Sequence, residues 1–230
     1  AGGGGKSDAL LMAALQYVGA PGYHALLLRR TYPDLALPEA IMARSHEWLG
    51  RTRATWHAGD KAWSFPSGAT LNFGYLQNEN DKYRYDSAAF HFIGWDELTQ
   101  FDESQYRFLF ARLRRRKGAG ETIPLRMRSA SNPGGRGHEW VKRRMLEEGP
   151  ARGRIFIPAT LEDNPHLDAS EYDRSLEELD PVTRAQRKRG DWTARHVGGY
   201  FQREWFEIVA EAPVGIQWVR FWDTASTEET

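Results

Sequence analysis

Ala1-Gly2-Gly3-Gly4-Gly5-Lys6-Ser7 is the stretch that decides the fold, because its last three residues match the second half of a phosphate-binding loop. Gly2, Gly3, Gly4 and Gly5 let the backbone turn its N–H groups around phosphate oxygens, since no Cβ stands in the way. Lys6 places a positive charge on the β- and γ-phosphates of ATP, and the Ser7 hydroxyl is a ligand for Mg²⁺. The alternative reading of these residues is a glycine-rich linker that ends in Lys-Ser.

The residues that follow favour the phosphate loop. The segment 8–18 carries apolar residues at helical spacing, and Gly19 supplies a stop. A phosphate loop leads into a helix whose N-terminus adds positive potential, so this order fits. The first glycine of the full pattern and the strand before the loop would both precede Ala1. We therefore expect an internal fragment that begins inside the loop.

A second anchor is the hydrophobic segment 90–95, which ends in the adjacent carboxylates Asp96 and Glu97. We predict a buried strand here, lying beside the strand that would carry the phosphate loop. In phosphate-loop ATPases such a strand directs its aspartate towards Mg²⁺, so Asp96 is the predicted metal ligand. Glu97 is then the predicted general base for the attacking water. The alternative, an acidic helix cap, is disfavoured by the Gly5-Lys6-Ser7 motif upstream.

A third polar group follows the predicted strand 123–131. Asn132 opens the turn Asn132-Pro133-Gly134-Gly135, at the edge of the sheet where ligands of open α/β folds bind. An amide there can sense the γ-phosphate or orient water. An ordinary Asn-Pro turn explains the same residues, and the turn alone favours that explanation.

Periodicity predicts the remaining elements. Pro33 and Pro38 bracket a predicted turn, and 77–84 is predicted as a loop or short helix. The alternation of strands with helices indicates an α/β fold with a mostly parallel sheet flanked by helices. The other predicted elements are strands at 23–28, 154–158 and 217–223, a hairpin over 62–65 and 70–75, and helices over 39–49, 102–113, 138–148, 169–179 and 181–189.

Composition limits the classes of function. The 31 basic and 31 acidic residues give a net charge of +0, so bulk charge offers no argument for nucleic-acid binding. The absence of cysteine excludes disulfides and thiolate zinc sites. No apolar run is long enough to span a membrane. The basic run 112–117 fits either a solvated helix end or a site that contacts DNA or a neighbouring subunit.

Taken in order, these motifs resemble the large terminase subunit of tailed bacteriophages, an ATP-driven DNA-packaging motor. The resemblance covers essentially the whole chain. It rests on the stretches Gly2 to Ser7, Trp95-Asp96-Glu97-Leu98-Thr99-Gln100-Phe101, Ser129-Ala130-Ser131-Asn132-Pro133-Gly134-Gly135, Asp163-Asn164-Pro165-His166-Leu167, Arg189-Gly190-Asp191-Trp192 and Phe221-Trp222-Asp223-Thr224-Ala225.

The resemblance implies a fold and a division of roles. The fold is a P-loop NTPase of the RecA/ASCE type at 1–200, a linker at 201–215 and the first strand of an RNase H-like nuclease at 216–230. Lys6, Ser7 and Asp96 would bind ATP and Mg²⁺, while Ser131 and Asn132 match a motif that couples hydrolysis to DNA movement. Asp223 matches the first metal-binding aspartate of the nuclease. A two-metal nuclease needs several converging carboxylates, so Asp223 alone does not build that site.

The resemblance also implies partners and a location. These are double-stranded DNA, the portal protein, the small terminase subunit and a homo-oligomeric ring that docks on the procapsid in the host cytoplasm. Motors of this type resemble ring ATPases, in which a neighbouring subunit can donate the arginine that stabilises the transition state. Arg84, Arg112 and Arg114 are candidates, and we favour Arg84 because it lies just before the strand that carries Asp96.

Two alternatives remain at this point. One is another P-loop, DNA-dependent ATPase of the helicase class, which would carry an arginine-bearing motif late in the ATPase domain, where this chain has Gly190-Asp191-Trp192. The other is an inactive prophage-remnant module that binds DNA independently of nucleotide. The presence of Lys6, Asp96, Glu97 and Asn132 together argues against decay.

Overall fold

The computed structural model describes residues 3–115, 123–160, 163–164 and 169–194. The chain divides between Arg195 and His196, and all described residues belong to the first unit. Gly2, the predicted linker at 201–215, the predicted strand at 217–223 and Asp223 lie outside the described residues. Those four predictions therefore stay predictions.

A six-stranded mixed sheet forms the centre of the first unit, with the order β2-β3-β4-β1-β5-β6. The four strands β4, β1, β5 and β6 run parallel, and β2 and β3 extend the sheet as an antiparallel ribbon. The predicted α/β class and the hairpin of β3 and β4 are confirmed. The strands are β1 (His24–Arg29), β2 (Thr55–His57), β3 (Ala62–Ser64), β4 (Thr70–Tyr75), β5 (Phe92–Asp96) and β6 (Arg126–Ala130).

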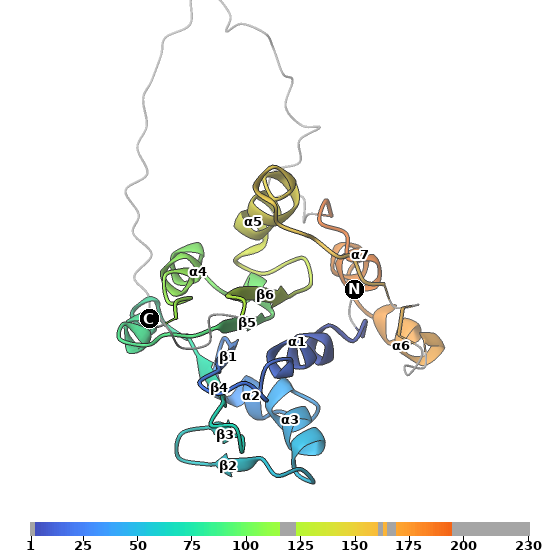
Figure 1. Ribbon diagram of the computed structural model, residues 1–230. Coiled ribbons are helices and arrows are strands. Elements are labelled where there is room, and N and C mark those ends of the chain that lie inside the picture. Colours follow the sequence, from blue (N-terminus) through green and yellow to red (C-terminus); the bar gives the residue numbers. More distant parts are fainter. Residues whose placement is uncertain (1–2, 116–122, 161–162, 165–168, 195–230) are drawn as a thin grey trace, which may run out of the picture. The chain divides into compact units, whose positions relative to one another are not determined.

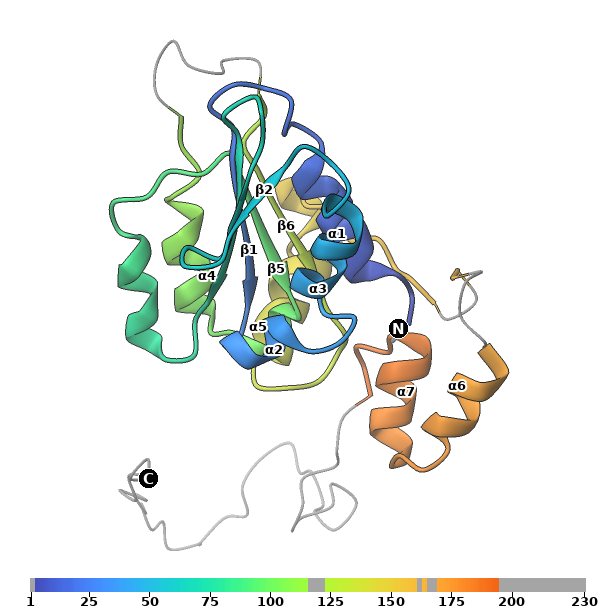
Figure 2. The same cartoon turned by 90° about the horizontal axis from the view of Figure 1, so that it is seen from below.

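Helices cover both faces of this sheet. In Figures 1 and 2, α4 lies across the sheet from α1 and α3. Most of the helices follow the predicted segments. Their bounds are α1 (Lys6–Leu15), α2 (Tyr32–Ala36), α3 (Ile41–Leu49), α4 (Glu103–Phe110), α5 (His138–Val141), α6 (Ala169–Leu176) and α7 (Pro181–Arg189), with short 3₁₀ turns at Glu79–Tyr85, Leu98–Gln100 and Pro150–Arg152 and a wider helical turn at Lys142–Glu147.

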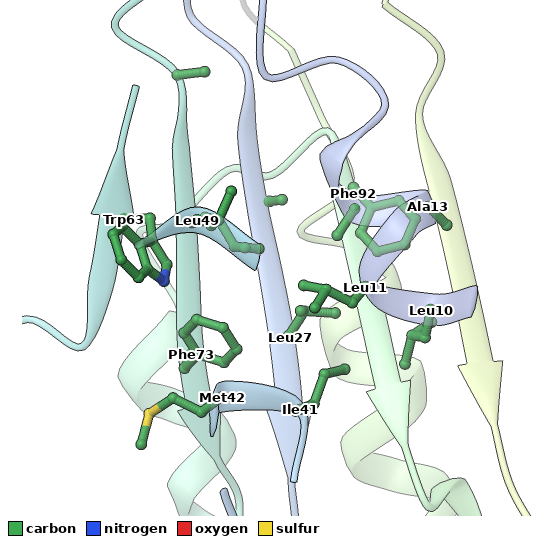
Figure 3. Packing of buried hydrophobic residues seen from close by; sticks show 14 of the residues in the cluster. Leu10, Leu11, Ala13, Leu27, Ile41, Met42, Leu49, Trp63, Phe73 and Phe92 are labelled. Carbon is green, nitrogen blue, oxygen red and sulfur yellow. The ribbon is translucent and has the colours of Figure 1, made fainter. Parts of the chain in front are cut away.

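The central strands are buried on both sides, which explains their nearly continuous apolar sequence. Successive residues of β1 point to opposite faces: Leu27 packs with α1 and α3, and Leu28 packs with α4 and α5. Figure 3 shows the first of these clusters, where Leu10 and Leu11 of α1 lie close to the sheet. This packing fixes α1, and with it the end of the glycine loop, against β5 and β6.

The predicted turn between Pro33 and Pro38 is wrong, because α2 occupies this segment. Thr31 caps the helix: its hydroxyl accepts a hydrogen bond from the Asp34 N–H, and the Asp34 carboxylate accepts one from the Thr31 N–H. Pro33 is tolerated because it lies in the first turn, where no intrahelical N–H bond is lost. The capping-box spacing of Thr31 and Asp34 was the signal in the sequence that could have predicted this helix.

Two strand predictions are also wrong. Residues 154–158 form no strand within the described part of the chain, and Ile155 and Ile157 are 87% and 80% exposed. The second wrong prediction placed the Asp96 strand beside the strand that would carry the phosphate loop. The two edges of β5 are instead taken by β1 and β6, so no third strand can pair with it.

Gly94, in the middle of β5, provides a test of how closely α1 packs on the sheet. A Cβ added at Gly94 would lie 2.5 Å from Leu27 Cδ2 and 3.2 Å from Leu10 Cδ1. We expect Gly94→Ala to lower the free energy of unfolding by about 1–3 kcal/mol, the usual cost of overpacking a core. Urea unfolding checks this. Gly59→Ala, where the added Cβ meets nothing within 4 Å, is the control, and equal stability of the two variants would contradict the prediction.

Candidate nucleotide site

The candidate site lies where the carboxyl ends of three parallel strands meet the start of α1. Arg29 ends β1, Asp96 ends β5, and Asn132 follows β6 after one intervening residue. Hydrogen bonds join them: Ser7 to Asp96, Arg29 to Asp96, and Asn132 to Glu97. The structure therefore brings together five of the predicted residues, namely Lys6, Ser7, Asp96, Glu97 and Asn132.

The described part of the glycine loop contains two left-handed residues. Gly3 and Gly5 have φ angles of 69° and 65°, in the left-handed region that side chains other than glycine rarely enter. Gly5 is the N-cap of α1, and its carbonyl accepts the first helical bond from the Ala9 N–H at 3.0 Å. A Cβ added at Gly5 would meet no atom within 4 Å, so the left-handed φ, and not crowding, is what favours glycine there. The N-terminus of a helix is suited to an anion.

Asp96 is the most buried acid of the site, with 1% of its surface exposed. Its Oδ1 accepts a hydrogen bond from the Ser7 hydroxyl at 2.8 Å, and its Oδ2 accepts one from Arg29 Nη1 at 3.1 Å. Both carboxylate oxygens are thus satisfied, as a buried charge requires. Sequence reasoning missed Arg29, although a charged residue at the end of a buried strand was the same signal that identified Asp96.

Opposite charges balance one another around this carboxylate. Burial raises the pKa of Asp96, and the Arg29 guanidinium is the largest influence in the other direction. Burial lowers the pKa of Lys6, while Glu97 and Asp96 oppose that shift. Arg29, Ser7 and Lys6 therefore favour the charged form of Asp96, while burial and the neighbouring Glu97 oppose it.

Glu97 follows Asp96 in an unusual backbone conformation. Its φ and ψ of 56° and 58° lie in the left-handed helical region, which costs a non-glycine residue about 1–2 kcal/mol. This turn directs the Glu97 carboxylate towards Asn132, whose Nδ2 donates a hydrogen bond to Oε1 at 3.3 Å. The Asn132 Oδ1 atom is buried without a partner in the described structure. An unsatisfied buried acceptor beside a candidate base is suited to a water or a ligand donor.

Thr99 holds the turn after β5 against the turn after β6, and sequence reasoning missed this role. Its N–H donates to Ser131 Oγ at 3.0 Å, and its hydroxyl donates to the Asn132 carbonyl at 3.0 Å. Its own carbonyl accepts a bond from the Gly137 N–H at 2.7 Å. These bonds fix Glu97 and Asn132 relative to each other.

The three candidate arginines lie elsewhere. Arg84 pairs with Asp81 at 2.7 Å and stacks over the Tyr75 ring, with 49% of its side chain exposed. Arg112 and Arg114 donate hydrogen bonds to backbone carbonyls in 86–88, before the amino end of β5, so they lie away from Asp96. These bonds support a structural role for the described part of the basic run.

The residues present fit Mg²⁺. Ser7 and Asp96 supply hard oxygen ligands, the kind that Mg²⁺ prefers, and their hydrogen bond already holds the two oxygens side by side. No group of three or more histidine, cysteine, aspartate or glutamate residues able to hold a metal occurs in the described ranges. Mg²⁺ needs no such group, because it commonly takes one or two protein oxygens together with phosphates and water.

Arg29→Met tests the buried ion pair. Removing Arg29 leaves the buried Asp96 charge with only the Ser7 hydrogen bond and the Lys6 charge as compensation, so we expect a loss of about 3 kcal/mol in the free energy of unfolding at neutral pH, the lower end of the range for a broken buried pair. The loss should shrink as the pH falls, because the pKa of Asp96 is raised and a protonated Asp96 needs no counterion. Urea unfolding at several pH values measures it. The Arg29→Met/Asp96→Asn double variant should recover most of the stability, and failure to do so would contradict this account.

Comparison with known protein families shows to which family of this fold the chain belongs. Residues 2–208 match the family described as "Terminase large subunit, T4likevirus-type, N-terminal". The chain belongs to this family. The match includes the glycine loop, the Asp96-Glu97 pair and the Asn132 turn, so the resemblance inferred from the motifs is confirmed.

Solved terminase structures share the fold. The large terminase of a thermophilic bacteriophage, in complex with ADP, has a TM-score of 0.63 and 20% identity, over 82% of this chain and 46% of that one. The complex of the same terminase with ATP-gamma-S gives 0.59 and 16%, over 82% and 45%. The HK97 bacteriophage large terminase gives 0.51 and 12%, over 82% and 44%. The chain thus spans less than half the length of these terminases.

Two further findings concern this terminase chain. A search of curated proteins found no significant match. Among the described residues, no helix has the length and apolar character needed to cross a lipid bilayer.

Proposed function

We propose that this chain is the ATP-hydrolysing part of a terminase motor that drives viral double-stranded DNA into a procapsid. The observation that supports this most strongly is the convergence of Ser7, Asp96, Glu97 and Asn132 at one sheet edge, next to a glycine loop with two left-handed residues. Family membership and the ADP and ATP-gamma-S complexes of the thermophilic bacteriophage terminase support nucleotide as the ligand.

Each residue has a role in this proposal. The N–H groups of Gly2 to Gly5 bind phosphate oxygens, and Lys6 places its charge on the β- and γ-phosphates. Ser7 and Asp96 hold Mg²⁺, which when bound neutralises the charge that develops on the phosphates. Glu97 accepts the proton of the attacking water, and Asn132 orients the Glu97 carboxylate through the bond to Oε1.

Arg84 is proposed to act on the nucleotide of a neighbouring subunit in a homo-oligomeric ring. Its pairing with Asp81 and its position over Tyr75 hold the guanidinium on the surface. Such an arginine stabilises the transition-state charge of phosphoryl transfer. The portal protein and the small terminase subunit are the other proposed partners, and the host cytoplasm is the proposed location.

The C-terminal residues complete the proposal. We assign 1–200 to the ATPase domain, 201–215 to a linker and 216–230 to the start of an RNase H-like nuclease domain. Asp223 is its proposed first metal ligand. The endonuclease activity itself requires further carboxylates.

ATP turnover with and without duplex DNA tests this function. We expect duplex DNA to stimulate turnover and to bind mainly through its phosphates, so affinity should fall steeply between 50 and 200 mM salt, by about 10³-fold for six phosphate contacts. Affinities for unrelated duplexes should agree within a few-fold. Strand separation would instead support a helicase. DNA binding unaffected by nucleotide, with no turnover, would support the inactive module.

A further inference from the structure

The Asn132 turn is in contact with two segments far along the chain. Gly134 and Gly135 follow Asn132 with φ angles of 96° and 79°, a conformation that favours glycine at both positions. A Cβ at Gly134 would lie 2.6 Å from the side-chain oxygen of Gln186 in α7. The turn that carries Asn132 is therefore packed directly against α7.

His138 connects the same turn to Trp192. The Gly134 N–H donates a hydrogen bond to His138 Nδ1 at 2.8 Å, so Nδ1 carries no proton. The proton of the neutral ring is then on Nε2, which lies 3.2 Å from the Trp192 carbonyl and donates to it. The His138 ring also packs against the Trp192 ring, with centroids 5.3 Å apart. Both residues are buried, with 7% exposed.

The segment at Trp192 is tied back to α7 as well. Gln186, itself 8% exposed, donates a hydrogen bond to the Ala194 carbonyl at 2.8 Å. Gly190 ends α7 in the left-handed conformation and turns the chain towards this contact. Residues 190–194 are thus held by His138 and Gln186, and the chain continues from them to 195–230.

These contacts form a continuous path from the candidate base. It runs from Glu97 to Asn132, through the backbone to Gly134, and through the His138 ring to Trp192. We propose that His138 is a positioning residue that transmits a change at the Asn132 turn to residues 190–194, and so to the chain that follows. This inference rests on the proposed function, since nucleotide binding at Glu97 and Asn132 is what would change the turn.

The two ring nitrogens of His138 can be tested separately. In His138→Asn, the amide oxygen takes the place of Nδ1 and keeps the Gly134 bond, but the bond to Trp192 is lost. In His138→Gln, the amide nitrogen takes the place of Nε2 and keeps the Trp192 bond, but the bond to Gly134 is lost. Glu139→Gln is the matched control, because it removes a charge 3.9 Å from His138 Nε2 and leaves both hydrogen bonds of the His138 ring in place.

Hydrogen–deuterium exchange of the backbone amides, with and without ATP-gamma-S and Mg²⁺, is the measurement. In the wild type and in Glu139→Gln, the nucleotide should change exchange both in 132–137 and in 190–194. In both His138 variants, the change in 132–137 should persist and the change in 190–194 should disappear. Without nucleotide, the Gly134 amide should exchange about fivefold faster in His138→Gln only, the effect of losing one net hydrogen bond.

The outcomes separate this inference from the proposed function. Unchanged transmission to 190–194 in both variants would overturn the role of His138, as would wild-type protein that binds ATP-gamma-S with no response there. Wild-type protein that does not bind ATP-gamma-S would overturn the proposed function instead. Exchange in β1 and β5 shows whether each variant is folded. A variant that unfolds is replaced by Trp192→Leu, which removes the aromatic ring that packs against His138 and should weaken the response at 190–194.

Discussion

Glu97→Gln is expected to lower the rate of ATP turnover by about 10²–10⁴-fold, the contribution of a general base, while nucleotide affinity stays within a few-fold of the wild type. Glutamine keeps the shape of the side chain and can still accept the hydrogen bond from Asn132, but it cannot take a proton from water. Steady-state turnover and equilibrium binding of a fluorescent ATP analogue measure the two quantities.

The control for Glu97 is Glu178→Gln, an exposed acid on the segment between α6 and α7. It should leave both turnover and affinity unchanged. If Glu97→Gln lost nucleotide binding together with turnover, Glu97 would be a binding residue and not the base. If it kept full turnover, the base would have to be another group.

Arg84→Ala is expected to lower turnover by about 10³-fold or more in the assembled ring, since a transition-state arginine contributes 10³–10⁵ in phosphoryl transfer. Nucleotide affinity should change little. Because Arg84 is held by Asp81 and Tyr75 at the surface, the proposal is that it serves a neighbour, and mixing subunits tests this. Lys6→Ala subunits lack the lysine that binds phosphate but retain Arg84. Arg84→Ala subunits lack that arginine but retain Lys6.

A mixture of these two inactive variants should regain part of the activity, because one subunit can supply Arg84 to the intact loop of the other. Arg112→Ala is the matched control: its guanidinium is bound to the 86–88 segment, so turnover should hold once the variant is shown to fold. Absence of recovery in the mixture, with each variant assembling normally, would show that Arg84 does not act between subunits.

Much of the site was predictable because motif residues at the ends of strands meet in a parallel sheet. Asp96 and Asn132 each follow an apolar run, and the sheet order β1-β5-β6 brings their strand ends together. Ser7 was predictable from the glycine loop. The positions of these residues follow from the local sequence and from the general geometry of a parallel sheet. A sequence motif is therefore enough to predict them.

Other features of the fold and of the site depend on contacts between distant residues, which a local sequence pattern does not show. Arg29 belongs to the site only because β1 pairs with β5, which places it beside Asp96. The segment 154–158 has the composition of a strand, but a strand also needs a neighbour, and none of the described strands pairs with it. The neighbour of β5 was misplaced for the same reason, since strand order is a property of the whole sheet.

The hydrogen bonds of the site also determine when it can form during synthesis. Ser7 and Asp96 are 89 residues apart in the sequence, and Arg29 and Asp96 are 67 apart. Contacts of this range form only after the intervening chain has closed into loops, which is slow. A nascent chain therefore has its glycine loop long before it has the carboxylates. On the proposed function, it would become able to bind Mg²⁺–nucleotide only once β5 and β6 have left the ribosome and paired.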